Sequence, residues 1–225
     1  MAETLPLNIP IPASAAIASF NYTDIAEGTG VVKFYGATSH SDGTKYYYLT
    51  TNTPYSQDIV ISGAQVLTDG TQLRIVQNTY GIRFNRPQNA KGTAYLNITI
   101  GGYSVSLFSG NKLWISGAYI QASGATTTTN MSPTVSGAVY NFTAANTVES
   151  QSMLIPLPIT GTQHFKAGEW LRLYIDLWGY NEAGDLSHGG YGNDPADRND
   201  TTAKTIADAS TTKLELYVPM LLNTN

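Results

Sequence analysis

The sequence contains no cysteine and few charged residues. Disulfide bonds and thiolate-bound metal sites are therefore excluded. Charged residues make up only 12% of the 225 residues, about half the share in a typical globular domain. The net charge is −4 and the chain has no block of basic residues. We therefore expect no binding to nucleic acid.

The sequence predicts neither a membrane span nor a secretory signal. Residues 5–23 carry no charge, but Pro6, Pro10 and Pro12 make this segment a poor spanning helix. The first charged side chain is that of Glu3, whereas a signal peptide begins with Lys or Arg. We expect no contact with a membrane and no signal peptide.

The motifs of common hydrolases do not occur either. There is no Gly-x-Ser-x-Gly and no His-Glu-x-x-His sequence. Asp176 and Glu215 could form the carboxylate pair of a glycosidase, but Arg172 and Lys213 would share their sheet face, and ion pairs across the strands explain all of them. The histidines lack metal-ligand spacing to one another: His40, His164 and His188. We expect that the chain is not an enzyme.

What the chain does contain is a series of short runs rich in β-branched and aromatic residues, separated by Gly, Asn and Asp turns. These runs predict strands over 31–38, 44–51, 58–62, 72–78, 94–100, 103–108, 112–120, 139–142, 153–159, 171–178 and 213–220. Gly101-Gly102 is typical of a hairpin turn, and Pro156 and Pro158 indicate an edge strand. Only residues 202–209 have a helical pattern.

The pattern favours an all-β protein, either a β-sandwich or a closed barrel. Our preferred fold is a jelly-roll-like antiparallel β-sandwich with loop insertions and an extended N-terminal arm. We expect the arm at 1–17 and a single β-sandwich domain at 18–225, with a long inserted loop at 179–208. Prolines alternate in the arm with apolar side chains, which would either form an edge strand of the same domain or dock on a neighbouring subunit: Leu5, Leu7, Ile9 and Ile11.

The predicted loop at 179–208 is rich in acidic side chains. Flexible, oxygen-rich loops suit Ca²⁺, although the spacing is not that of an EF-hand. The candidate ligands are Glu182, Asp185, Asp194, Asp197 and Asp200. The alternative is a polar loop in solvent, without any cofactor.

Aromatic side chains outside the expected core form a second candidate site. Trp178 lies opposite to the apolar stripe of its strand, which runs from Leu171 to Leu177. Exposed aromatic rings either stack on sugars or become buried between subunits. The residues that we expect at such a contact surface are Tyr48, Trp178, Tyr180 and Tyr191.

One sequence pattern near the C-terminus resembles a known group of proteins. In residues 164–175 the order Phe165-Lys166-x-Gly168-Glu169-x-Leu171-x-Leu173 forms a turn followed by a long strand. Together with the strand at 213–220, it resembles the late strands of jelly-roll virion proteins of bacteriophages, which include capsid decoration, minor capsid and fibre-head domains. The resemblance covers the last quarter of the chain.

The resemblance implies a structural virion protein, capsid-associated or decorating, that stabilises a viral shell through protein–protein contacts. It implies a homo-oligomer, with a trimer favoured, bound to other capsid proteins and made in the host cytoplasm. Low charge agrees with burial of much of the surface in an assembly, because interfaces are depleted in Lys and Glu. The alternative is a carbohydrate- or receptor-binding β-sandwich module that depends on Ca²⁺ or acts without it.

Overall fold

The computed structural model describes residues 29–63, 70–105, 110–124, 126–182, 186–200 and 205–221. Within these ranges the chain forms a 12-stranded sheet and no helix. The predicted arm, with Leu5, Leu7, Ile9 and Ile11, lies outside the described residues. The strands are β1 (Thr29–Ser41), β2 (Thr44–Thr50), β3 (Val60–Gly63), β4 (Thr71–Arg83), β5 (Gln88–Ser104), β6 (Lys112–Ser123), β7 (Thr128–Asn130), β8 (Tyr140–Asn141), β9 (Thr147–Phe165), β10 (Trp170–Asn181), β11 (Leu186–Gly192) and β12 (Leu214–Leu221).

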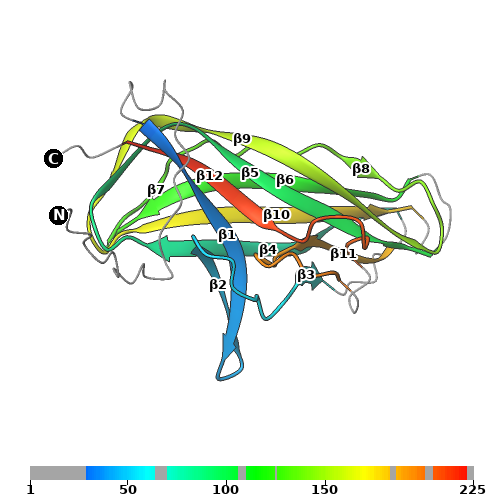
Figure 1. Ribbon diagram of the computed structural model, residues 1–225. Coiled ribbons are helices and arrows are strands. Elements are labelled where there is room, and N and C mark those ends of the chain that lie inside the picture. The colour runs from blue at the N-terminus through cyan, green and yellow to red at the C-terminus, as the bar shows by residue number, and fades with distance from the viewer. Residues whose placement is uncertain are drawn as a thin grey trace, which may run out of the picture.

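The strands form two facing halves of a sandwich (Figure 1). The strand order is β3-β11-β5-β12-β1-β2-β4-β10-β6-β7, with β9 beside β5 and β8 beside β6. One half is built on β9, β5, β12 and β11, and the other on β4, β10 and β6. Among the described strands, a single parallel pair, Tyr48 with Gly81, connects β2 to β4, whereas the other pairings are antiparallel. This arrangement confirms the predicted all-β sandwich.

The core follows from the alternation of apolar side chains along each strand. Leu171, Leu173, Ile175 and Leu177 of β10 are fully buried, as their spacing predicts. Leu96 and Ile98 of β5 and Leu214 and Leu216 of β12 occupy the same cluster from the opposite half. Since alternate positions face the core, the remaining side chains of β10 form an outer face.

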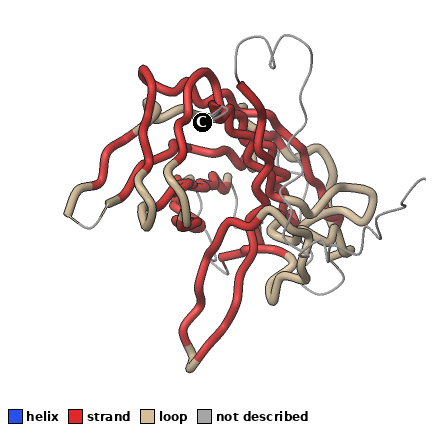
Figure 2. The backbone as a smooth tube through the Cα atoms, turned by 60° about the vertical axis from the view of Figure 1, so that its left-hand side comes forward, coloured by secondary structure: helices blue, strands red, loops and turns tan. Residues whose placement is uncertain are grey.

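The hairpin of β1 and β2 projects from the body of the sandwich (Figures 1 and 2). Its turn contains Asp42 and Gly43, both with positive φ, and residues 41–46 are exposed. Beyond the bridge at Tyr48, the outer edge of β2 has no strand partner among the described residues. Within those residues we also find no helical segment with the length and apolar character of a membrane span.

The predicted hairpin turn at Gly101-Gly102 is wrong, because β5 continues through both glycines. Here β5 is enclosed by β9 and β11. A Cβ atom on Gly101 would lie 2.6 Å from the Glu149 carbonyl oxygen and still closer to that of Thr205. The glycines therefore serve the close approach of neighbouring backbone rather than a reversal of the chain.

The predicted ion pairs between residues 172–176 and 213–215 are also wrong, because β10 and β12 lie in different halves. Asp176 instead pairs with Arg74 across β10 and β4, at 2.9 Å. Glu215 pairs with Lys33 across β12 and β1, at 3.2 Å. The edge position predicted from Pro156 and Pro158 is confirmed, since β9 pairs only with β5 among the described strands.

Two further expectations near the C-terminus need correction. The segment 179–208 is not one long loop: β10 extends to Asn181, and β11 lies inside the segment, paired with β3 and β5. The expected helix at 202–209 is absent from 205–209, the part of it that the structure describes. The glycines of β11 allow this strand to fit between its neighbours, because Gly190 and Gly192 lie so close to neighbouring backbone that a Cβ atom would not fit.

Candidate functional site

The outer face of β4, β10 and β6 carries paired aromatic and polar side chains, which we call the aromatic face. Its rows follow the register of the strands. Trp178 lies between Arg74 of β4 and Trp114 of β6, and Tyr180 lies between Gln72 and Lys112. Successive side chains of a strand point to opposite faces, so the residues between the buried leucines of β10 point outwards and form this face.

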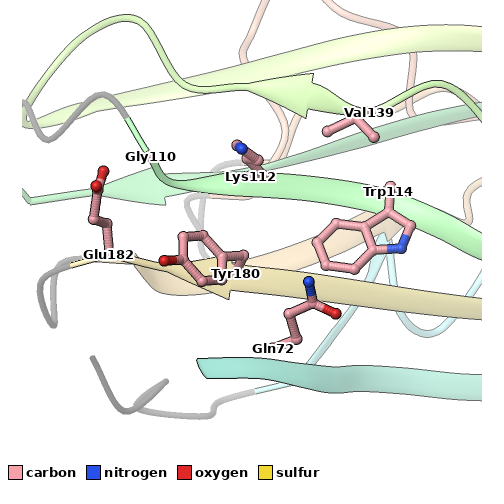
Figure 3. Close-up of a pocket in the computed structure, with 7 residues that line it drawn as sticks. All are labelled: Gln72, Gly110, Lys112, Trp114, Val139, Tyr180 and Glu182. Carbon is pink, nitrogen blue, oxygen red and sulfur yellow. The ribbon is translucent and has the colours of Figure 1, made fainter. Parts of the chain in front are cut away.

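A cavity of about 520 Å³ opens at one end of the aromatic face. Figure 3 shows that the rings of Trp114 and Tyr180 lie near the side chain of Gln72, with Glu182 at the Tyr180 end. We call this cavity the groove. It is lined by Gln72, Gly110, Lys112, Trp114, Val139, Tyr180 and Glu182.

The polar side chains of the groove make few contacts with the described residues. The side chains of Gln72 and Glu182 make no hydrogen bond or ion pair with any residue that the structure describes. The Lys112 ammonium nitrogen lies 5.8 Å from the centre of the Tyr180 ring, a cation–π distance. A Cβ on Gly110 would overlap the Glu182 carboxylate, so the missing side chain leaves room for that group.

Further along the aromatic face, the polar groups bind one another. The Arg74 guanidinium donates to both carboxylate oxygens of Asp176, at 2.9 and 3.4 Å, and lies 5.5 Å from the centre of the Trp178 ring. Tyr119 and Tyr174 stack with their ring centres 4.5 Å apart. The indole Nε1 of Trp178 is buried and has no hydrogen-bond partner among the described residues.

The four predicted contact aromatics separate in the structure. Trp178 and Tyr180 are half-buried neighbours on the aromatic face. The position of Trp178 was expected from its phase in the strand, whereas Tyr180, predicted in the loop, lies there because β10 extends to Asn181. Tyr48 lies away from them in β2, where it pairs with Gly81 of β4. Tyr191 is not a surface residue: it is fully buried, and its hydroxyl accepts a hydrogen bond of 2.8 Å from Asn78. The reason is that Tyr191 belongs to β11, which the sequence pattern did not predict.

The predicted calcium ligands are distributed over separate contacts. Asp194 binds Arg198 at 2.8 Å, and Asp200 accepts backbone hydrogen bonds from Thr205 and Ile206. Asp197 binds Lys213 at 3.1 Å. Glu182 lies in the groove, and Asp185 falls outside the described residues. Across the described ranges there is no group of three or more acidic, histidine or cysteine side chains placed to hold a metal ion.

These contacts change the acidity of Asp194. Burial by itself raises the pKa of its carboxyl group, but hydrogen bonds from the Arg198 side chain and from the backbone of Arg198 and Ser56 outweigh it. The pKa therefore lies below its ordinary value of 3.8. The carboxylate is ionised at neutral pH and stabilises the segment that follows β11.

A second exposed surface lies on the other half of the sandwich, over β5 and β9. Leu154 is 60% exposed and Tyr95 is 42% exposed. Pro156 lies opposite Tyr95, and both Pro156 and Pro158 are exposed. We call these residues the β5–β9 patch. Exposed apolar patches of this kind mark protein contact sites.

Analysis of the sequence identified Tyr180 and Glu182 of the groove but missed its other lining residues: Gln72, Gly110, Lys112, Trp114 and Val139. The strand at 112–120 was expected, and its alternation already places Lys112 and Trp114 opposite to the buried Leu113 and Ile115. This alternation could have predicted that Lys112 and Trp114 face outwards. No sequence pattern could have predicted that Gln72 lies near them, because its position depends on the pairing of β4 with β10.

Comparisons with known proteins find no matching family model and no match among curated proteins. A crystal structure of a CocE/NonD family hydrolase from Staphylococcus aureus has 10% sequence identity and a TM-score of 0.40, over 84% of this chain and 36% of the hydrolase chain. A second crystal structure of that hydrolase has 11% identity and a TM-score of 0.35, over 83% and 34%. The chain spans about a third of the hydrolase chains that it matches.

This finding contradicts the prediction that the chain is not an enzyme, because both structures are of a hydrolase. A structure of infectious bursal disease virus, Gx strain, has 12% identity and a TM-score of 0.22, over 97% of this chain and 61% of the viral chain. At these TM-scores the likenesses assign neither an activity nor a partner to this protein.

Proposed function

We propose that this protein is a structural subunit of a virion, capsid-associated or decorating, that stabilises a viral shell through contacts with copies of itself and with other capsid proteins. The observation that carries the proposal is the β5–β9 patch. It places a large aliphatic side chain, an aromatic ring and two prolines side by side on the outside of a sheet. Contact with a partner protein would remove this apolar surface from water, which is favourable.

The surroundings of the patch support a protein partner. Tyr217 of β12 lies beside Tyr95 of β5, so the aromatic surface continues across the sheet. The nearby charges neutralise each other, because Lys33 binds Glu215 at 3.2 Å and lies 5.0 Å from the centre of the Tyr217 ring. Protein interfaces are enriched in tyrosine and depleted in Lys and Glu, and here Lys33 and Glu215 beside the tyrosines form an ion pair.

The mass of the purified protein in solution, measured by light scattering, tests the assembly. We expect a closed oligomer, with a trimer favoured, and a fall to monomer for Leu154→Glu. Val105→Glu is the matched control, because Val105, directly after the end of β5, is 44% exposed and lies outside the patch. A monomeric wild-type protein, or equal masses for Leu154→Glu and wild type, would contradict the role of the patch.

Association with a shell is tested by co-sedimentation with capsids assembled from the major coat protein of the same virus. The wild-type protein should sediment with the capsids and Leu154→Glu should remain in the supernatant. A chain that lacks residues 1–12 tests the docking arm predicted from the sequence: it should form a folded sandwich and fail to bind capsids. Normal binding by this truncated chain would remove the arm from the proposal.

A further inference from the structure

We propose that the groove at the end of the aromatic face binds a neutral saccharide. This site is independent of the β5–β9 patch, which lies on the other half of the sandwich. A volume of about 520 Å³ falls within the range of small-ligand sites, roughly 300–1,000 Å³, and suits one or two sugar rings.

The aromatic rings supply the stacking surfaces that such a ligand needs. Trp114 and Tyr180 both line the groove and are only half-buried, so part of each side chain is available to a ligand. One side of a pyranose ring presents mainly C–H groups, which pack against aromatic faces. Neighbouring outward positions on a strand are about 6.7 Å apart, so Trp178 continues the row beyond Tyr180.

The polar side chains supply hydrogen bonds of both kinds. Gln72 offers a donor and an acceptor, Glu182 offers acceptors, and Lys112 offers donors. A hydroxyl group needs both kinds of partner, since it donates one hydrogen bond and accepts others. The side chains of Gln72 and Glu182 make no hydrogen bond or ion pair with the described residues, so a ligand would displace no such bond within that part of the protein.

The charges of the groove favour a neutral ligand. Among the described residues that line it there is one carboxylate and one ammonium group, so their charges give neither an anion nor a cation a net attraction. An apolar peptide would leave both charges and the Gln72 amide without partners on burial, which is unfavourable. A polyhydroxylated ring satisfies the amide and the charges while its C–H side covers the aromatic rings.

The experiment is a glycan array with the full-length protein, with and without Ca²⁺, followed by calorimetric titration of the strongest soluble oligosaccharide. We expect binding to neutral glycans that does not require Ca²⁺. Tyr180→Ala and Trp114→Ala should each weaken the affinity about tenfold or more. Trp170→Ala is the matched control, because Trp170 is a 38% exposed aromatic residue of β10 outside the groove.

Gln72→Ala keeps the test valid if an aromatic variant fails to fold, because Gln72 is exposed and its side chain makes no hydrogen bond or ion pair with the described residues. This variant should melt at the wild-type temperature and lose affinity severalfold. The proposal is overturned if a folded wild-type protein binds no glycan, or if binding survives both Gln72→Ala and Tyr180→Ala. Loss of the oligomer in Trp114→Ala without glycan binding by the wild type would instead identify the groove as a protein contact.

Discussion

The buried hydroxyl group of Tyr80 donates a hydrogen bond of 2.7 Å to the Oδ1 atom of Asn193. The amide nitrogen of Asn193 donates in turn to the Ser56 hydroxyl at 2.9 Å and to the Asp58 carbonyl oxygen at 3.0 Å. One asparagine thus connects β4, the segment before β3 and the segment after β11. A buried network of this kind holds three parts of the chain in a single arrangement.

Tyr80→Phe should lower the free energy of unfolding by about 1–2 kcal/mol, because it leaves the Asn193 Oδ1 atom without its buried donor. Urea unfolding followed by tryptophan fluorescence measures this change. Tyr46→Phe is the control, since Tyr46 is exposed in β2 and its loss of a hydroxyl should change the free energy by less than about 0.5 kcal/mol. Equal unfolding midpoints for Tyr80→Phe and wild type would contradict this role of the network.

Asp194→Asn should destabilise the protein by about 2–4 kcal/mol, because the buried carboxylate accepts hydrogen bonds from Arg198 and from the Ser56 amide. Thermal unfolding of the variant measures the loss. Asp208→Asn serves as the control, since Asp208 is exposed near the end of the same segment. Similar stabilities of the two variants would show that the Asp194 contacts contribute little.

The stability should fall as the pH drops below about 4. The folded protein holds the pKa of Asp194 below its ordinary value of 3.8, so the unfolded chain takes up a proton at a higher pH than the folded chain. The contribution of Asp194 is therefore complete above that value and is lost as the pH falls towards the folded pKa. Urea unfolding between pH 7 and pH 3 should show a smaller loss for Asp194→Asn than for wild type, and parallel curves would refute the assignment.

Gly101→Ala should destabilise the protein by more than about 2 kcal/mol, because the new methyl group would meet the carbonyl oxygens of Glu149 and Thr205. Gly70→Ala is the comparison. Gly70 has a φ of 68° but nothing within 4 Å of the new atom, so only the backbone cost of about 1–2 kcal/mol applies. A larger loss for Gly70→Ala than for Gly101→Ala would show that β5 is less confined than the structure indicates.

Trp178→Phe should leave the stability unchanged or raise it. The indole N–H is buried without a partner in the described structure, and phenylalanine removes that donor while it keeps an aromatic ring beside Arg74. Calorimetric melting of the variant measures the effect. A loss of more than about 2 kcal/mol would show that the size of the indole ring, rather than its unpaired donor, dominates at this position.

The strands were predictable where alternation was regular, and the pairing between them was not. The stripe from Leu171 to Leu177 identifies β10 and its inner face, because apolar residues at every second position lie on one side of a strand. The same reasoning cannot choose the neighbours of a strand. Arg172 was therefore paired with the wrong half of the sandwich, and Gly101 was interpreted as a turn when it is an enclosed position in a strand.

The candidate site was predictable to the extent that one strand defines it. Trp178 and Tyr180 were expected outside the core, and their phase in β10 places them there. Tyr191 was assigned to the surface because a short, glycine-rich strand such as β11 has no apolar alternation. Gln72 joins the groove only through the register of β4 against β10, which no local pattern reveals.

The antiparallel pairing of β1 with β12, from Thr29 opposite Leu221 to Tyr35 opposite Glu215, has a consequence during synthesis. β1 leaves the ribosome before the other described strands, and it can pair with β12 only after β12 has been synthesised. Until then β1 presents an unpaired edge to other nascent chains. Such long-range pairing slows folding, and the sheet cannot be completed before residues 214–221 of β12 have been translated.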